Sequence, residues 1–359
     1  MKIWQLVDAR SVGGIERHVA TLVKALCARR FEAQVVLWRG YTPSSFRDQL
    51  VAEGVPHRVL DGSLRSYLAA LTRERPALVH THGYKANLVG RLVARACGIP
   101  VVSTYHSGDR GTFPVSLYLA ADIATSRLAP RIAVSDEIAG RLPQPVSVVR
   151  NFLMVEPTPP AASLPRRVGF IGRLSPEKGP DLFCRIAAAA PPGIEWHVWG
   201  DGPMHGELQR TFGDRIVFHG LTLDVGQALR SIGLLLMPSR AEGLPMAALE
   251  AMAAGVPVAA SRVGGMPGLI AQGDNGWLFQ SADVAEAVSR IAAWRDLDHE
   301  AQIALRRRCH ATVLGRYSDT AVLPEMLEIY RKAGLPDGDQ APAGEGARYP
   351  VTVADRPIS

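Results

Sequence analysis

The stretch "GLLLMPSRAEGLPMAALEAMAAGVPVAAS", residues 233–261, has the pattern of a strand, a loop, a helix and a second strand. Its first apolar run and the closing "VPVAAS" at 256–261 are typical of buried strands. Pro245 fits the first turn of the helix between them. Two buried strands joined through a helix predict a parallel sheet that is covered by helices.

The same alternation of short apolar runs and longer amphipathic runs extends over most of the chain. Helical patterns occur, for example, at residues 14–30 and 85–98. Strands are expected at residues 2–7, 32–38, 77–82, 100–106 and 131–135, and again at 166–172, 194–200, 215–220, 233–239 and 256–261. We therefore predict an α/β protein with two doubly wound, Rossmann-like parallel-sheet domains that face each other across a cleft. Such sheets bind ligands at the carboxyl ends of their strands.

The length of the chain, 359 residues, exceeds what one hydrophobic core usually supports. Prolines interrupt regular structure at 151–167, which indicates a linker. We expect an N-terminal domain at 1–150, a C-terminal domain at 168–315, and a helix at 316–333 that crosses back to the first domain. The Gly- and Pro-rich segment 334–359 lacks periodicity and is expected to be disordered.

The composition is that of an ordinary globular protein, with 47% hydrophobic and 21% charged residues. The four cysteines have no metal-ligand spacing, which favours reduced thiols. Asp8 and Arg10 come before any apolar core of signal-peptide length, and no apolar run of about 18 residues is present. We predict a cytoplasmic protein.

Basic residues are concentrated in the first half of the chain. Residues 1–150 contain 20 Lys and Arg against 11 Asp and Glu, whereas the whole chain has a formal net charge of only +6. One interpretation is a solvated charge excess that maintains solubility. The other is peripheral contact with an anionic membrane surface or a lipid phosphate. Nucleic acid is not indicated as a partner, because the arginines are dispersed and no nucleic-acid-binding motif accompanies them.

The segment "VGFIGRLSPEKGPDLF", residues 168–183, predicts a buried strand, a polar loop and a helix with Pro180 in its first turn. Arg173 and Lys178 flank the loop. Two cations beside a helix N-terminus fit a diphosphate group. The alternative is a surface loop with ordinary basic residues. The spacing of a Walker loop is absent.

Two glutamates, Glu242 and Glu250, lie eight positions apart on either side of a Gly-Leu-Pro turn. Glu242 precedes the predicted helix, near its positive end, and Glu250 lies inside it between apolar neighbours. With the turn between them, both carboxylates are able to line one elongated ligand, with the backbone amides of 243–246 beside its phosphates. The alternative is a first-turn charge and a solvated helix residue.

A glycine pair, Gly13 and Gly14, lies where the first strand gives way to the first helix and permits close approach of a ligand to the backbone. The spacing is not G-x-G-x-x-G, which argues against a nicotinamide-dependent dehydrogenase. A D-x-D at 296–298 falls in a polar helical stretch, and we expect no metal role for it.

Three histidines lie outside these motifs, and each has either a functional or a structural role. His80 and His82 follow a strand end and either face an acceptor cleft or are polar filler, since no third metal ligand completes a set. His310 is expected on a helix surface.

These motifs together resemble the retaining GT-B glycosyltransferases of family four, whose C-terminal domain is of the "glycosyl transferases group 1" type. The resemblance covers about residues 3–333 and rests on Gly13-Gly14, "YHSG", "GRLSPEKG", "WGDGP", "FHG", "EGLPMAALEAMAAGVPVAAS" and "GGMPGLI". It implies transfer of a sugar from a nucleoside-diphosphate sugar, most commonly a UDP-sugar, to a glycan or lipid-linked acceptor with retention of configuration. Synthesis of an envelope polysaccharide or lipopolysaccharide at the inner membrane face agrees with the basic first half.

The resemblance also assigns roles to single residues. Arg173 and Lys178 match the pair that neutralises the donor diphosphate. Glu250 matches the carboxylate that holds the ribose, and Glu242 the one that contacts the donor sugar. His106 matches a histidine close to the reacting sugar. Further donor-binding positions are Gly13, Gly14, His219, Gly220, Gly243, Leu244 and Pro245.

The implied catalysis needs no metal or other cofactor, because cations and a helix N-terminus neutralise the leaving diphosphate. Two parts of the chain depart from the family pattern. Phe152 and Leu153 stand where a glycine and an apolar residue are usual, and Gly268 replaces an acidic residue beside the sugar pocket. The alternatives are a sugar-nucleotide epimerase or hydrolase of the same fold, or a non-catalytic nucleotide-sugar-binding module. The presence of both glutamates, Arg173 and Lys178 favours the transferase over the first alternative, and the presence of His106 and Glu242 favours it over the second.

Overall fold

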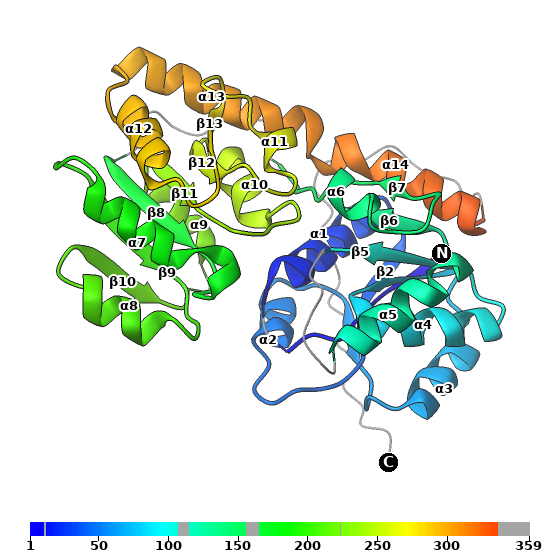
Figure 1. Ribbon diagram of the computed structural model, residues 1–359. Helices are drawn as coiled ribbons and strands as arrows, with labels where there is room; N and C mark the ends of the chain where they lie inside the picture. The colour runs from blue at the N-terminus through cyan, green and yellow to red at the C-terminus, as the bar shows by residue number, and fades with distance from the viewer. Residues whose placement is uncertain (11, 107–114, 156–164, 223, 337–359) are drawn as a thin grey trace. The chain divides into compact units, whose positions relative to one another are not determined.

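The computed structural model describes residues 1–10, 12–106, 115–155, 165–222 and 224–336. The chain divides into two compact units: unit 1 comprises Met1–Met154 and Val322–Ser359, and unit 2 comprises Val155–Ala321. Each unit contains one sheet flanked by helices, and every strand pair in both sheets is parallel (Figure 1). The expected α/β class with two parallel sheets is therefore confirmed.

Unit 1 contains a seven-stranded sheet in the order β3-β2-β1-β4-β5-β6-β7. Its strands are β1 Lys2–Val7, β2 Glu32–Leu37, β3 His57–Val59, β4 Leu78–His82, β5 Val101–Tyr105, β6 Arg131–Ala133 and β7 Ser147–Val148. Its helices are α1 Gly14–Ala28, α2 Ser45–Ala52, α3 Leu64–Glu74, α4 Tyr84–Ala96, α5 Val115–Thr125, η1 Ser126–Leu128 and α6 Asp136–Ala139. The central strands β1, β4 and β5 are almost entirely buried, as expected for continuous apolar runs covered by helices.

Unit 2 contains a six-stranded sheet in the order β10-β9-β8-β11-β12-β13. Its strands are β8 Arg167–Ile171, β9 Glu195–Trp199, β10 Ile216–Gly220, β11 Leu234–Met237, β12 Val258–Ser261 and β13 Gly276–Phe279. Its helices are η2 Pro176–Lys178, α7 Pro180–Ala189, α8 His205–Phe212, α9 Val225–Arg230, α10 Met246–Ala253, α11 Met266–Leu269, α12 Val284–Arg295 and α13 His299–Arg316. The chain order reverses at β8, which lies between β9 and β11, so the loops after β8 and β11 meet at a topological switch point.

The last described helix, α14 (Asp319–Ala333), contributes to the core of unit 1. Leu323, Met326 and Tyr330 are fully buried in the hydrophobic cluster that also contains Ile3 and Leu22. The Tyr330 hydroxyl accepts a hydrogen bond from the amide of Gln5 in β1, at 3.2 Å. The helix thus completes a core that begins with the first strand.

Three strands were not expected from the sequence, namely β3, β7 and β13. They contain three, two and four residues and occupy the outer positions of their sheets. Short edge strands carry little periodicity, which explains why the pattern missed them. Part of the expected linker and most of the expected disordered segment lie outside the described residues. Within the described part, no helix is long and apolar enough to cross a membrane.

Candidate functional site

The loop after β11 brings Glu242 to Lys178, which ends the short helix η2. The ammonium of Lys178 lies 2.8 Å from each carboxylate oxygen, Oε1 and Oε2. The hydroxyl of Ser239 donates a further hydrogen bond to Oε1 at 2.8 Å. The side chain of Glu242 is only 5% exposed and that of Lys178 is 32% exposed. A carboxylate this buried requires such compensation, and Lys178 and Ser239 provide it.

Backbone contacts with residues 264–265 hold the Glu242 loop in place. The amide of Gly265 donates to the carbonyl of Gly243 at 2.6 Å. At Gly264, where φ is +54°, an added Cβ would lie 2.0 Å from the carbonyl oxygen of Glu242. Only glycine combines this conformation with this close approach. The segment 264–265 therefore buttresses the loop.

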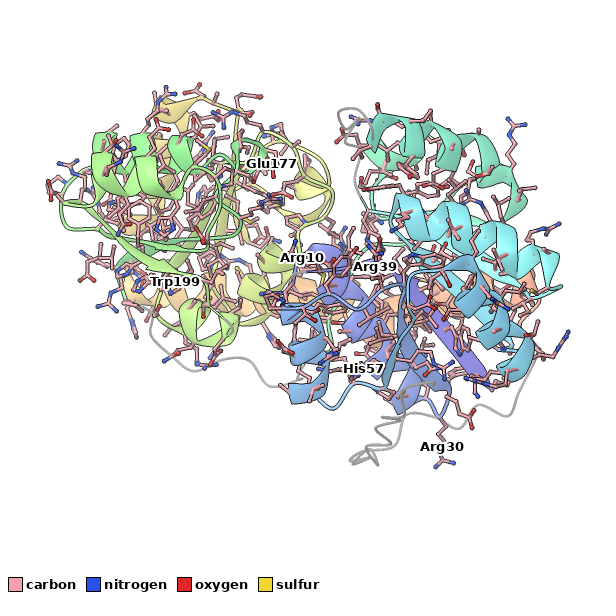
Figure 2. The ribbon with its side chains drawn as sticks, turned by 90° about the horizontal axis from the view of Figure 1, so that it is seen from below. Arg10, Arg30, Arg39, His57, Glu177 and Trp199 are labelled. Carbon is pink, nitrogen blue, oxygen red and sulfur yellow. The ribbon has the colours of Figure 1, made fainter. Side chains whose placement is uncertain are left out.

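An ion pair anchors the same loop to the start of α7. Arg240 donates to Asp181 through both terminal nitrogens, at 2.8 and 2.6 Å. Its backbone amide also donates to the carbonyl of Glu177, which is marked in Figure 2, at 2.8 Å. Arg240 holds the pKa of Asp181 below its ordinary value through these hydrogen bonds. No sequence motif indicates this pair, because its members lie 59 positions apart.

The other donor-binding residues predicted in unit 2 lie on adjoining elements. Arg173 lies exposed in the loop between β8 and η2. Pro245 is the N-cap residue of α10, directly before the helix rather than in its first turn, and Leu244 before it is buried. Glu250 lies inside α10 and is half-buried. The predicted placement of one glutamate before the helix and one inside it is thus observed.

His219 and Gly220 form the end of β10, and Gly220 has a φ of +71° at a bulge in the strand pairing. The imidazole of His219 stacks on Trp199, with ring centroids 4.4 Å apart and an interplanar angle of 6° (Trp199 is marked in Figure 2). A ring nitrogen of His219 also lies 2.9 Å from His197. Desolvation lowers the pKa of His219, so its ring is neutral at pH 7.

In unit 1, Gly13 is the N-cap residue of α1 and Gly14 its first residue, and both are exposed. His106 follows the last residue of β5, and its Nε2 lies 3.0 Å from Nδ1 of His82. Burial lowers the pKa of both histidines well below the ordinary value, and neighbouring histidines lower it further. The neighbours of His106 at 107–114, which complete the "YHSG" motif, lie outside the described residues.

His80 and His82 lie within β4 and not beyond it, which corrects the expectation that they follow a strand end. Both are buried. His80 is held by Tyr330 at 2.7 Å and by Thr104 at 2.6 Å, so it is a satisfied core residue. His82 instead reaches His106, and His18 of α1 lies beside both. His18 is therefore a third histidine close to His82 and His106 in the fold, although it is distant from both in the sequence.

Two further expectations are corrected. His310 is buried and not on a helix surface, because α13 packs on α10 and Nδ1 of His310 lies 2.8 Å from the carbonyl oxygen of Ala253. The D-x-D at 296–298 does not lie in a helix but separates two of them. Asp296 is the C-cap of α12 and pairs with Arg295, and Asp298 caps α13 by accepting from the Ala301 amide.

Sequence comparison identifies the family. The model for "Glycosyltransferase Family 4" matches residues 12–153, and the model for "Glycosyl transferases group 1" matches residues 165–294. The 2-deoxystreptamine N-acetyl-D-glucosaminyltransferase of Streptomyces fradiae is 30% identical, in an alignment that covers 90% of this chain and 91% of the relative. The chain belongs to the family 4 glycosyltransferases of the GT-B type.

Other relatives of this glycosyltransferase agree with the assignment. The UDP-Gal:alpha-D-GlcNAc-diphosphoundecaprenol alpha-1,3-galactosyltransferase of Escherichia coli is 25% identical over 305 residues, covering 75% of this chain and 78% of the relative. The crystal structure of HepE from Anabaena in complex with UDP-glucose has the same fold, with a TM-score of 0.78, 20% identity and coverage of 92% of this chain and 100% of that one. The protein is accordingly a transferase that moves a glycosyl group.

Proposed function

We propose that this glycosyltransferase transfers a sugar from a UDP-sugar to a glycan or lipid-linked acceptor in cell-envelope polysaccharide or lipopolysaccharide synthesis, with retention of anomeric configuration. The observation that carries the proposal is the pairing of Lys178 with the buried carboxylate of Glu242 at the switch point of the unit 2 sheet. Open parallel sheets bind ligands at such a point. The exposed guanidinium of Arg173 adds a second cation to the same connection between β8 and α7.

The proposed chemistry follows from the charge that develops when the bond between sugar and phosphate breaks. Arg173 and Lys178 neutralise the leaving diphosphate, together with the backbone amides at the start of α10. Glu242 accepts hydrogen bonds from the donor sugar. Glu250, inside α10, accepts hydrogen bonds from the ribose hydroxyls. No metal or cofactor is required in this proposal.

The UDP specificity and the acceptor class rest on the relatives. The Escherichia coli relative is named for a UDP-galactose donor and a diphosphoundecaprenol-linked acceptor, and the HepE structure contains UDP-glucose. Both support a uridine nucleotide for this chain. The first also supports a lipid-linked acceptor.

A calorimetric titration of UDP, GDP and ADP into the full chain with EDTA present tests the donor assignment. We expect UDP to bind with a micromolar Kd and to bind more tightly than the other two nucleotides. Lys178→Met and Glu250→Ala are expected to weaken UDP binding at least about tenfold, equivalent to about 1.4 kcal/mol. Arg185→Ala is the matched control, because Arg185 is an exposed cation of α7. Failure of all three nucleotides to bind, also after Mg²⁺ is restored, would contradict the proposed site.

Retention is tested on the product. In the proposed reaction the leaving phosphate deprotonates the acceptor hydroxyl, and no protein nucleophile is needed. The anomeric proton coupling in the NMR spectrum of the first product should therefore match that of the donor sugar. A product of inverted configuration would exclude the retaining mechanism.

Peripheral membrane contact is supported by the exposed apolar side chains of α5 in the basic unit 1. Leu117 is 65% exposed and Tyr118 is 46% exposed, and the ring of Tyr118 lies 6.2 Å from that of Tyr84 at the start of α4. Exposed apolar side chains in a domain of net positive charge suit an anionic lipid interface. Leu117→Glu should reduce sedimentation with phosphatidylglycerol vesicles, whereas Leu221→Glu, at a 79% exposed leucine of unit 2, should not.

A further inference from the structure

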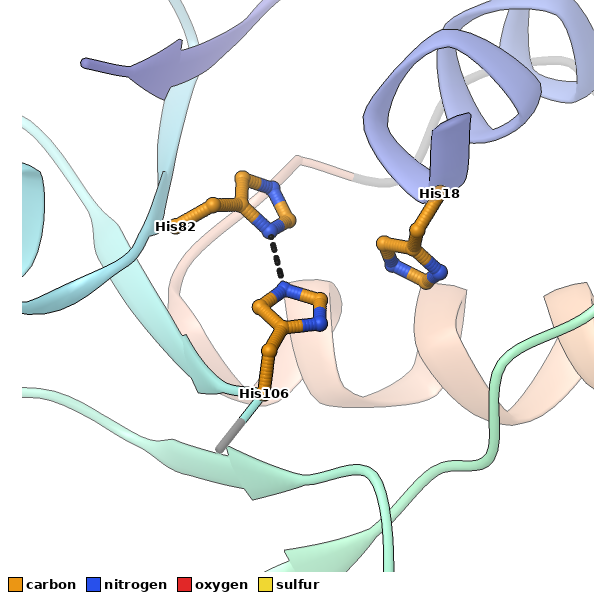
Figure 3. Close-up of side chains that lie close together, drawn as sticks. All are labelled: His18, His82 and His106. Carbon is orange, nitrogen blue, oxygen red and sulfur yellow. Dashed lines mark hydrogen bonds between the residues drawn. The ribbon is translucent and has the colours of Figure 1, made fainter. Parts of the chain in front are cut away.

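Three histidines from different elements of unit 1 converge on one point. His18 comes from α1, His82 ends β4 and His106 follows β5 (Figure 3). One ring nitrogen of each lies within 4.8 Å of the nitrogens of the other two. His18 and His82 are buried, at 1% exposure each, and His106 is half-buried. His18 and His82 are therefore shielded from solvent, whereas His106 is partly accessible to it.

We propose that His18, His82 and His106 bind a transition-metal cation of the Zn²⁺ type. Neutral imidazoles are preferred ligands of Zn²⁺, and three protein ligands with an open fourth position are a common arrangement. With Zn–N bonds of about 2.0–2.1 Å, tetrahedral ligand nitrogens lie about 3.3 Å apart. The His82 and His106 nitrogens are already 3.0 Å apart. The widest separation in the cluster, at most 4.8 Å, must shorten by about 1.5 Å or less on binding.

His18 provides the second observation that indicates a ligand. Neither of its ring nitrogens has a hydrogen-bond partner in the described part of the chain, although the residue is 1% exposed. Buried polar groups without partners are rare, and a site for an ion is one of their recognised causes. Phe152 packs edge-on against the ring, with centroids 5.8 Å apart, and offers it no hydrogen bond. A bound cation would give one of these nitrogens its partner.

The surroundings of His82 also suit a ligand. Its Nε2 lies 2.8 Å from the side-chain oxygen of Gln5, while the Gln5 amide nitrogen donates to Tyr330. With Gln5 in this orientation, Nε2 of His82 carries the proton and Nδ1 presents its lone pair to the cluster. Metal-binding histidines usually have such a partner on the second nitrogen, which fixes the tautomer and the ring orientation. His80 has both nitrogens occupied by Tyr330 and Thr104 and is therefore excluded from the ligand set.

The probe is the metal alone. The chelator-treated full chain is titrated with Zn²⁺ in competition with a chromophoric chelator, and separately with Co²⁺, whose visible absorption reports tetrahedral coordination. We expect one Zn²⁺ per chain with a micromolar or lower Kd, and Co²⁺ absorption of the four-coordinate type. His18→Gln and His106→Gln should each weaken Zn²⁺ at least about tenfold. The matched control is His57→Gln, in the same unit but outside the cluster (His57 is marked in Figure 2).

The variants also separate a lost ligand from a lost fold. UDP binding of His18→Gln and the far-ultraviolet circular dichroism of both variants should equal those of the native chain. If His18→Gln does not fold, His106→Gln decides, because His106 is only half-buried. The proposal is overturned if Zn²⁺ binds no more tightly to the native chain than to a folded ligand variant. It is equally overturned if the bound Co²⁺ shows only six-coordinate absorption.

Discussion

The ion pair between Lys178 and Glu242 makes a quantitative prediction about donor binding. Both carboxylate oxygens of Glu242 lie 2.8 Å from the Lys178 ammonium, so a bound diphosphate must share this cation. Glu242→Gln keeps the shape of the side chain and removes its charge. Lys178 then faces the diphosphate without a competing anion. The first expectation is therefore that nucleotide affinity does not fall.

The size of the effect follows from the exposure of the two partners. Lys178 is 32% exposed, so solvent screens the pair even though Glu242 is only 5% exposed. A pair of this kind contributes on the order of 1 kcal/mol, which corresponds to about a fivefold change in Kd. We expect Glu242→Gln to bind UDP between one and about five times as tightly as the native chain. Lys178→Met should bind it at least about tenfold more weakly.

Catalysis should respond in the opposite sense. Glu242 is assigned to the donor sugar, so its loss removes transition-state interactions, and the transfer rate of Glu242→Gln should fall at least about a hundredfold. Calorimetry with UDP and a radiolabelled-sugar transfer assay measure the two quantities on the same preparations. Equal weakening of UDP binding by Glu242→Gln and by Lys178→Met would contradict the role assigned to Glu242. In that case the carboxylate would position the cation and would not contact the sugar.

Three further predictions concern the framework around the site. Gly264→Ala should displace the Glu242 loop, because the new Cβ would meet a carbonyl oxygen 2.0 Å away at a φ of +54°. The change should cost about 1–3 kcal/mol of stability and most of the transfer activity. Gly315→Ala, in α13 with nothing within 4 Å of the new Cβ, is the control and should leave the activity unchanged. Arg91→Leu should lower the free energy of unfolding in urea by about 3–5 kcal/mol, since it leaves the carboxylate of Asp122, 2.8 Å away and 2% exposed, buried without its cation. Arg240→Ala should lower the free energy of unfolding by less than about 1 kcal/mol, because Arg240 and Asp181 are both partly exposed. The size of this loss should depend on pH.

The sign of the last prediction follows from the depressed pKa of the partner carboxyl of Arg240, Asp181. A group whose pKa is lower in the folded state stabilises the fold above its unfolded pKa, which is about 3.9 for aspartate. The difference in urea midpoint between the native chain and Arg240→Ala should be constant from pH 7 to about pH 5 and decline progressively below about pH 4, as the pH falls through the lowered pKa of Asp181. A difference that shows no decline between pH 5 and pH 2 would show that the hydrogen bonds act without the charge.

The central strands of both sheets were predictable from the sequence, because runs such as Leu234–Met237 are apolar throughout. Such runs are expected where helices cover both faces of a parallel sheet. The sequence also located Lys178, Glu242 and Glu250 on the correct loops and helix. It did not predict the direct pairing of Lys178 with Glu242, because residues 64 positions apart meet only when the strands before their loops become neighbours.

The spacing of histidines in the sequence does not predict the histidine cluster, for a related reason. The register of β4 and β5 places His82 opposite Thr104, which brings His106, two residues further on, to the same end of the sheet. No local pattern encodes this register. His18 shares no motif with either histidine and enters the cluster only because α1 packs beside these strand ends.

The position of α14 has a consequence for synthesis of the chain on the ribosome. The fully buried residues Leu323, Met326 and Tyr330 belong to the same core as the first strand, and Tyr330 bonds Gln5 across 325 positions. Unit 2 is one continuous segment, Val155–Ala321, whereas unit 1 lacks this helix until translation has passed residue 330. The second half of the gene product is therefore able to fold before the first. A nascent chain stopped short of α14 would expose the core of its N-terminal sheet to chaperones and proteases.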